Sequence, residues 1–160
     1  MKMAGFYDES ISNGLGWRAV LFVSGCPHHC PGCHNKQAQD YNYGEEFNKQ
    51  EILNRIQKNS ILKGITVSGG EPLCKENIAE VVDFIKDVKK IKPNFNIWCY
   101  TGYTMEELEK KKQQIEDAPV TMLQNEFTKD ITVVSNTKGA IALLKRIIYR
   151  LGISRRKEML

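Results

Sequence analysis

Residues 18–35 read RAVLFVSGCPHHCPGCHN, an apolar run that leads directly into a loop with three closely spaced cysteines. The run at residues 18–24 is short, and a buried strand is the structure that such a run predicts. Cys26, Cys30 and Cys33 follow in a CxxxCxxC spacing, with glycines and prolines between them. In a reducing compartment such a cluster indicates metal binding rather than a disulfide framework. The stretch therefore predicts a strand that ends in a metal-binding loop.

The number of thiols distinguishes between the metals that this loop could hold. A structural zinc site needs four ligands, so one of His28, His29 or His34 would have to complete it. A 4Fe–4S cluster is held by cysteine thiolates, usually four, and three would leave one iron open to a small molecule. We favour the cluster and interpret His28 and His29 as loop residues, not ligands, with a zinc-stabilised nucleic-acid-binding module as the alternative.

Strand-like and helix-like patterns alternate along the rest of the chain. Strands are predicted at residues 64–68, 96–100, 120–123 and 131–135, and helices at about 48–60, from Thr104, and at 76–90 and 140–151. This alternation predicts the α/β class, with a mainly parallel sheet and right-handed crossovers. A complete (βα)8 barrel needs about 250 residues. The 160 residues therefore predict one domain, residues 1–160, built as a partial (βα) barrel with an open side.

A second motif, VSGGEPL at residues 67–73, ends the second predicted strand. Gly69 and Gly70 permit unusual backbone angles and let a ligand approach the main chain closely. Glu71 taken alone has a structural alternative, as a charge that satisfies amide donors at a helix N-terminus. Ligand sites of parallel sheets lie at the carboxyl ends of the strands. Both the cysteine loop and this motif are predicted to lie there.

Composition excludes some classes of protein and leaves the role of one segment open. Hydrophobic residues make up 41% and charged residues 26%, and no apolar run reaches the roughly 18–20 residues of a membrane span. The first residues lack the pattern of a signal peptide, so we expect a cytoplasmic location without membrane contact. Residues 138–160 carry a net charge of +6. This charge fits either a solvated helix face or contact with an acidic partner, nucleic acid or a membrane surface.

The CxxxCxxC loop after an early strand resembles the signature of the radical S-adenosylmethionine superfamily. The resemblance implies that Cys26, Cys30 and Cys33 hold a 4Fe–4S cluster, whose unique iron binds the amino and carboxylate groups of S-adenosylmethionine. Many relatives place an aromatic residue before the third cysteine, where it contacts the adenine. Gly32 stands there in this chain. The adenine contact is then expected from the backbone of Gly32 and Cys33 or from His34.

The SGGEP stretch resembles the GGEP motif of the same superfamily. In that superfamily the motif contacts the amino group of the methionine moiety. The resemblance assigns this role to Gly69, Gly70 and Glu71. It also implies the partial-barrel fold of the superfamily.

Residues 12–18 (SNGLGWR) and 98–103 (WCYTGY) narrow the resemblance to the activating proteins of anaerobic ribonucleotide reductases. These proteins cleave S-adenosylmethionine reductively and abstract a hydrogen atom from a glycine of the reductase, which leaves a stored glycyl radical. The expected partners are the reductase large subunit and an electron donor such as a flavodoxin; nucleic acid is not expected. An activase of another glycyl-radical enzyme, such as a formate-lyase-like partner, is the alternative.

The resemblance covers about residues 5–108. Relatives usually continue with a strand ending in Asp-Gly and an Arg-Gly-Ser-Ser-Asn-Gln-like segment. Neither is found from about residue 120 onward. Neither of the two remaining cysteines is expected among the ligands. Cys99 is expected in the core, and Cys74 in the core or at the surface rather than near the site.

Overall fold

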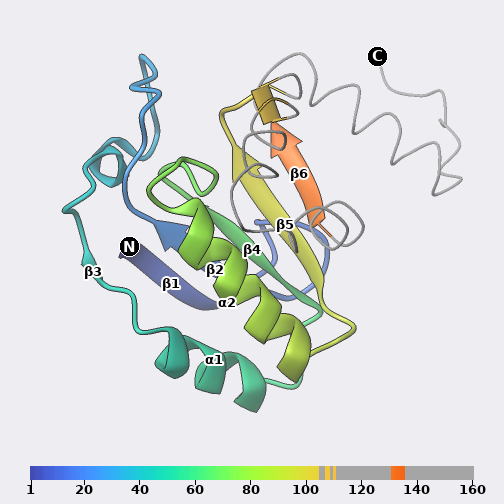
Figure 1. Cartoon of the computed structure of the whole chain (residues 1–160). Helices are drawn as coiled ribbons and strands as arrows, with labels where there is room; N and C mark the ends of the chain where they lie inside the picture. Colours follow the sequence, from blue (N-terminus) through green and yellow to red (C-terminus); the bar gives the residue numbers. More distant parts are fainter. Residues whose placement is uncertain (105–106, 109, 111–130, 136–160) are drawn as a thin grey trace, which may run out of the picture.

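A single mixed sheet forms the centre of the computed structural model, which describes residues 1–104, 107–108, 110 and 131–135. The strand order is β3-β1-β2-β4-β5-β6, and the sheet stays open (Figure 1). The strands are β1 (Lys2–Ser10), β2 (Arg18–Val23), β3 (Glu45–Glu46), β4 (Gly64–Gly69), β5 (Asn96–Thr101) and β6 (Ile131–Ser135). The helices are α1 (Lys49–Lys58) and α2 (Ile78–Ile91), with a short 3-10 turn at Lys36–Gln39.

Four neighbouring strands, β2, β4, β5 and β6, run parallel. Arg18 pairs with Gly64, and Gly64 pairs with Asn96, so the strands start level and end at one edge. This arrangement confirms the predicted α/β class with a mostly parallel, open sheet. The strand predicted at residues 131–135 is confirmed as β6.

The antiparallel edge made by β1 and β3 was not predicted. β1 pairs antiparallel with both β2 and β3, and its register with β2 shifts twice. Its sequence, KMAGFYDES, lacks a clean alternation of apolar and polar residues, and none of its residues is fully buried. The period-two signal that identifies a half-buried strand is therefore absent.

Both α1 and α2 lie on the same face of the sheet (Figure 1). The Asn48 side chain accepts a hydrogen bond from the backbone N–H of Glu51 at 3.2 Å, which confirms the predicted start of α1. Alternate residues of β2, β4 and β5 meet these helices, as the two-residue period of a strand requires. The buried residues of this layer include Leu21, Val67, Ile97, Ile52, Phe84 and Val88.

The other predicted segments lie partly outside the described residues. The strand at 120–123, the helix at 140–151 and the basic segment 138–160 all fall there. Thr104 and Glu107 exchange hydrogen bonds, at 2.7 and 3.2 Å, in the reciprocal pattern of a capping box.

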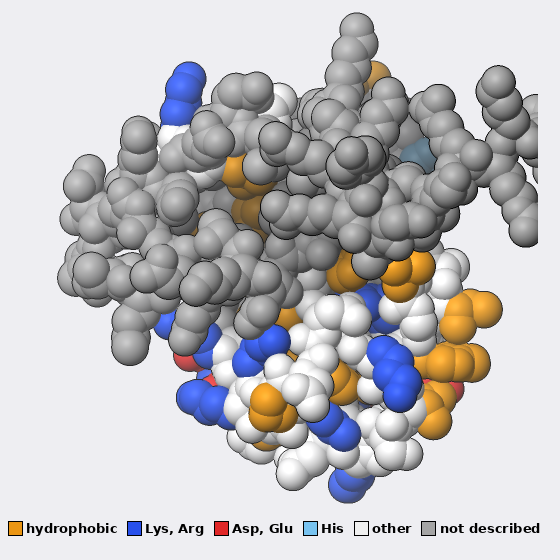
Figure 2. All heavy atoms as spheres, turned by 90° about the vertical axis from the view of Figure 1, so that its right-hand side faces the viewer, with side chains coloured by type: hydrophobic (Ala, Val, Ile, Leu, Met, Phe, Trp, Pro, Cys, Tyr) orange, Lys and Arg blue, Asp and Glu red, His pale blue; other side chains and the backbone are white. Residues whose placement is uncertain are grey.

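Within the described part of the chain, neither helix is long and apolar enough to cross a bilayer. Exposed hydrophobic side chains are interspersed with Lys and Arg on the described part of one face (Figure 2).

Candidate functional site

The cysteine loop and the GGEP loop are joined by backbone hydrogen bonds at the carboxyl ends of β2 and β4. The N–H of Gly70 donates to the carbonyl of Val23 at 2.7 Å, and the N–H of Glu71 donates to that of Gly25 at 2.8 Å. The side-chain amide of Asn77 donates to the carbonyls of Ser24 at 2.9 Å and Glu71 at 3.1 Å. The two predicted motifs are therefore brought together at the expected edge of the sheet.

Both glycines of the second motif lie against other backbone, Gly69 against the end of β2 and Gly70 against the cysteine loop. Gly69 has a φ of +100°, which L side chains rarely adopt, and an added Cβ would lie 2.5 Å from the carbonyl oxygen of Val23. A Cβ on Gly70 would overlap the carbonyl oxygen of Gly25 and lie 2.7 Å from that of Ala38. The side-chain space of these glycines is thus filled by the protein's own backbone.

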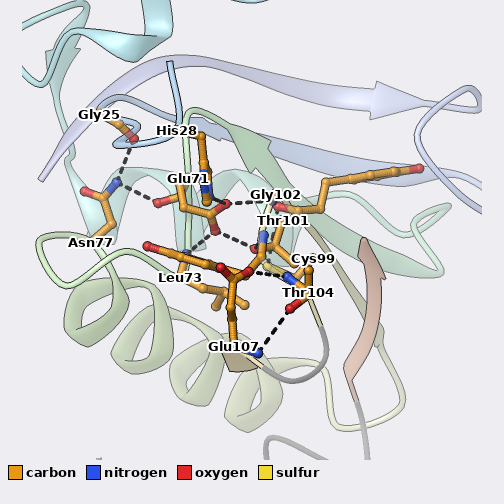
Figure 3. A network of polar contacts seen from close by, with 12 residues as sticks. Gly25, His28, Glu71, Leu73, Asn77, Cys99, Thr101, Gly102, Thr104 and Glu107 are labelled. Atoms are coloured by element: carbon orange, nitrogen blue, oxygen red, sulfur yellow. Dashed lines mark hydrogen bonds and ion pairs between the residues drawn. The ribbon is translucent and has the colours of Figure 1, made fainter. Parts of the chain in front are cut away.

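Glu71 is the buried centre of the site, with a side chain 1% exposed (Figure 3). Oε1 accepts hydrogen bonds from the N–H of Leu73 at 2.9 Å and the hydroxyl of Thr101 at 2.8 Å. Oε2 accepts one from the N–H of Gly102 at 2.8 Å and lies 3.1 Å from Nε2 of His28. These donors compensate the burial of the carboxylate. Glu71 therefore connects the cysteine loop, its own loop and the end of β5.

Backbone hydrogen bonds join the start of the cysteine loop to the residues that follow the loop. The N–H of Gly25 donates to the carbonyl of Ala38 at 2.8 Å, and the N–H of Cys26 donates to that of Gln39 at 3.1 Å. Between these points the backbone turns sharply at His29, with φ +46°, and at Gly32, with φ +71°. The loop is thus held at its base, and its cysteines extend beyond the sheet.

All five cysteines are free thiols, but their surroundings differ. Cys30 is exposed, while Cys26 and Cys33 are partly exposed. Burial raises the pKa of the Cys26 thiol; the nearby charges of Glu71, Cys30 and Cys33 raise it further, against a backbone hydrogen bond at His28 that lowers it. Three thiols of one short loop therefore lie close enough to interact electrostatically.

Cys74 and Cys99 are both buried. This confirms the core position predicted for Cys99 and decides between core and surface for Cys74. The backbone N–H of Cys74 donates to the carbonyl of Glu71 at 3.3 Å, while Cys99 lies within β5. Burial raises the pKa of both thiols. Neither has the exposure that a reactive thiolate needs.

The donor chemistry of the loop allows a cluster, whereas a single structural zinc would need a fourth ligand besides the three thiols. A single zinc needs its four ligands at about 2.0–2.3 Å from one point. A 4Fe–4S cluster takes its thiolates on separate irons, so its ligands need not converge in this way. The three loop thiols fit that requirement in number and chemistry.

The residues predicted to contact S-adenosylmethionine differ in exposure. Gly32 and His34 are exposed and Cys33 is partly exposed, whereas Glu71 is buried and already bound to protein donors. A Cβ on Gly32 would meet no atom within 4 Å. The loop thus offers open backbone at Gly32, as the predicted adenine contact needs, while the contact roles themselves stay predictions.

Sequence reasoning missed three parts of this site: His28, Thr101 and Gly102. His28 was interpreted as an ordinary loop residue, and the WCYTGY stretch served only to narrow the resemblance. The chain offered one signal, a Thr-Gly pair directly after a predicted strand, because the carboxyl ends of parallel strands meet at one edge. No pattern in the sequence pairs His28 with Glu71, 43 residues away.

The chain matches a known family and is similar to proteins of known name. The family model described as a 4Fe-4S single cluster domain matches residues 12–142. That range extends past residue 120, where motif comparison alone predicted divergence. The chain is 35% identical over 130 residues to the anaerobic ribonucleoside-triphosphate reductase-activating protein of Escherichia coli (strain K12), covering 79% of this chain and 84% of that protein.

Two further relatives carry the same name. The Haemophilus influenzae protein is 37% identical over 117 residues, which cover 71% of this chain and 76% of that protein. The protein of Enterobacteria phage T4 is 37% identical over 105 residues, covering 64% of this chain and 67% of that protein. With the family model matching most of its length and the cysteine loop joined to the GGEP loop, the chain belongs to the family of anaerobic ribonucleoside-triphosphate reductase-activating proteins.

Proposed function

We propose that this protein is a radical S-adenosylmethionine activase that generates a glycyl radical on anaerobic ribonucleotide reductase. Its cofactors are a 4Fe–4S cluster and S-adenosylmethionine, as the family match implies. Cys26, Cys30 and Cys33 would hold the cluster. The observation that carries the proposal is the joining of the cysteine loop to the GGEP loop at the carboxyl ends of β2 and β4.

The chemistry divides between the cofactors and the chain. When bound, the cluster and S-adenosylmethionine supply reductive cleavage of the sulfonium and a radical that abstracts hydrogen. The chain supplies position. Glu71 holds the ends of β4 and β5 together through Leu73, Thr101 and Gly102, and the backbone around Gly69 and Gly70 sets the distance to the cysteine loop. Glu71 and the two glycines are proposed to orient the methionine moiety; Gly32, Cys33 and His34 are proposed to contact the adenine.

An open sheet suits a protein substrate. We propose that residues 1–160 form one domain whose open side is covered by the reductase during the reaction. Such a cover would protect a reactive radical from solvent and stray hydrogen donors. Efficient turnover of a free small molecule by the isolated chain would count against this idea.

The electron donor and the cellular location extend the proposal. We propose a flavodoxin-like protein as the source of the electron and the cytoplasm as the place of action. The exposed and partly exposed thiols of the cysteine loop suit a reducing compartment, where such thiols persist. The absorbance of the cluster would report whether purified flavodoxin reduces it, and this measurement would test the donor.

The deciding experiment compares two cysteine variants of the full chain after anaerobic reconstitution. Cys30→Ala removes an exposed loop thiol, and Cys99→Ala removes a buried thiol from β5 as the matched control. We expect the parent and Cys99→Ala to bind similar amounts of iron and sulfide and to form 5′-deoxyadenosine, and Cys30→Ala to do neither. Equal iron in the Cys30 variant and the parent would refute the ligand assignment, and stoichiometric zinc would support the zinc alternative.

The partner is tested by electron spin resonance. Reconstituted protein, reductant, S-adenosylmethionine and the reductase large subunit should give a glycyl-radical signal that is lost with Cys30→Ala. A signal formed instead only with a formate-lyase-like partner would support the alternative activase.

A further inference from the structure

One side chain connects the exposed part of the cysteine loop to the buried centre of the site. His28 lies between Cys26 and Cys30, and its Nε2 is 3.1 Å from Oε2 of Glu71 (Figure 3). Its ring also meets the ring of Tyr103 edge-on, with centroids 4.5 Å apart. The His28 side chain is 22% exposed and that of Glu71 only 1%. A loop that reaches solvent is therefore anchored on a buried carboxylate.

The end of β5 is shaped to receive this imidazole. A Cβ added to Gly102 would lie 2.8 Å from Cδ2 and 3.0 Å from Nε2 of His28. A side chain at position 102 would displace the His28 ring from its present place. The backbone N–H of Gly102 binds the same carboxylate oxygen that His28 contacts. Ring, glycine and carboxylate form one interlocking contact.

The neighbouring histidine has different surroundings. His29 is exposed and takes a backbone conformation with φ +46°. It directly follows His28, within the same loop between Cys26 and Cys30. His29 is therefore a matched control for any change made at His28.

We infer that His28 is a positioning residue, which holds the cysteine loop against Glu71 and the end of β5 and so sets the place of the loop thiols relative to the S-adenosylmethionine-binding glycines. The part of this inference that concerns S-adenosylmethionine rests on the proposed function. The part that concerns the loop does not, because the contact exists in the chain without cofactors. A carboxylate only accepts hydrogen bonds, so His28 donates through Nε2.

Three substitutions separate the two contacts of the imidazole. His28→Ala removes both, His28→Gln keeps a donor for Glu71, and His28→Phe keeps a ring against Tyr103. His29→Asn is the control, since asparagine tolerates a positive φ. We expect the effects to rank Ala and Phe above Gln, with the control close to the parent.

The first measurement uses the metal-free full chain. The rate of alkylation by iodoacetamide is followed for each cysteine by peptide mass mapping. A hydrogen bond to a charged group is worth enough that its loss should speed alkylation of Cys26 roughly tenfold in His28→Ala. Cys99, buried in β5, should keep its parent rate in every variant, which shows that the fold is intact. An unchanged Cys26 rate in a folded His28→Ala chain would overturn the anchoring role.

The second measurement uses the reconstituted protein. We expect His28→Ala to bind iron close to the parent level, to bind S-adenosylmethionine roughly tenfold more weakly, and to show a reduced change in the electron spin resonance signal of the reduced cluster when S-adenosylmethionine is added. His28→Gln should recover most of the affinity. A merely structural role would lower stability without changing this spectrum. Affinity within twofold of the parent in His28→Ala would contradict the positioning role.

A reciprocal substitution tests the same contact from the other side. Gly102→Ala places a methyl group where the imidazole lies but leaves the N–H to Glu71 in place. It should speed alkylation of Cys26 as His28→Ala does, and the double variant should be no faster than either single variant, because both remove one contact. Additive effects would contradict this coupling.

The proposed function and this inference can fail separately. If the parent binds no cluster or forms no 5′-deoxyadenosine, the proposed function fails, yet the alkylation rates in the metal-free chain still decide whether His28 anchors the loop. If the parent is active and the His28 variants match it in both measurements, only this inference fails.

Discussion

The two ends of the parallel strands each contain one buried charged side chain, and they use it differently. At the amino end, Arg18 is fully buried and its guanidinium donates to Thr66, to Asn96 and to the carbonyls of Leu15 and Ile65. At the carboxyl end, Glu71 accepts from loops that meet around it. At the amino end the buried charge binds the strands to one another, and at the carboxyl end it joins loops that follow different strands.

The hydrogen bonds of Arg18 explain how the strands are held together at their amino end. Nε of Arg18 lies 2.7 Å from the hydroxyl of Thr66, and one terminal nitrogen lies 2.7 Å from the carbonyl of Ile65. The planar fork thereby joins β2 to β4 and β5, and it lies over the ring of Trp98. Burial lowers the pKa of Arg18 to about 10. Its partners among the described residues belong to strands or to the segment just before β2, so we assign this charge to stability.

Glu71 joins segments that carry the candidate chemistry. Its contacts come from the GGEP loop, from the end of β5 and from the cysteine loop through His28. Burial, together with the charge of Glu71, raises the pKa of the nearby Tyr103 phenol to about 12. In barrels of parallel strands, functional residues lie at the carboxyl ends of the strands, and residues at the amino ends mainly stabilise the fold. The two buried charges follow this division.

The largest loss of stability is expected from Arg18→Met. The substitution leaves buried acceptors of Thr66, Ile65 and Asn96 without their donor, so we expect the free energy of unfolding to fall by about 3–4 kcal/mol. Urea unfolding of the metal-free chain measures it. Arg18→Lys keeps the charge but not the fork and should recover less than half of the loss. A loss of unfolding free energy below about 1 kcal/mol would contradict the stabilising role assigned to Arg18 at the amino end of the strands.

Glu71→Gln should lower activity more than stability. The amide group puts a donor against the N–H of Leu73 or Gly102, at a cost of about 2 kcal/mol in the free energy of unfolding. Formation of 5′-deoxyadenosine should fall roughly 100-fold, since one of the two acceptor oxygens that join the loops is replaced by a donor. The exposed neighbour Glu76→Gln is the control and should change neither. Loss of stability without loss of activity would make the carboxyl end equivalent to the amino end.

Gly70→Ala tests how closely the two loops must approach. The added methyl group overlaps the backbone of Gly25, so we expect a loss of about 1–3 kcal/mol and lower iron content after reconstitution. Gly5→Ala in β1 is the control, because a Cβ there meets no atom within 4 Å. Thermal unfolding and iron analysis measure both variants. Equal behaviour of the two alanines would show that the loops need not be this close.

The smallest effect is expected at an exposed pair, which serves as the reference for both buried charges. The side-chain hydrogen bond from Arg55 lowers the pKa of Asp8, so the folded-state pKa lies below the unfolded value of about 3.9. The stabilisation is therefore present above that pH and is lost as the pH falls through the folded-state pKa. Asp8→Asn should cost less than about 1 kcal/mol at pH 7 and progressively less as the pH falls below the unfolded value, as measured by urea unfolding. A larger cost at pH 7 would contradict this reading.

Local patterns in the sequence determined the individual elements and the identity of the chemistry. The apolar runs of β2, β4 and β5, the cap at Asn48 and the helical spacing of α2 were predicted within two residues of their observed bounds. These features depend on residues near one another in the chain, so propensity and periodicity reveal them. The CxxxCxxC spacing and the GGEP motif likewise placed both loops at one edge.

Tertiary structure alone decided which side chains meet there. Glu71 contacts Thr101 and Gly102 about 30 residues later and His28 43 residues earlier, because sheet order places β4 between β2 and β5. The protein's own backbone fills the space beside Gly69 and Gly70. This contact also depends on how close together the ends of β2 and β4 lie. Such contacts leave no period or spacing in a single sequence, since they arise only when separate strands end side by side.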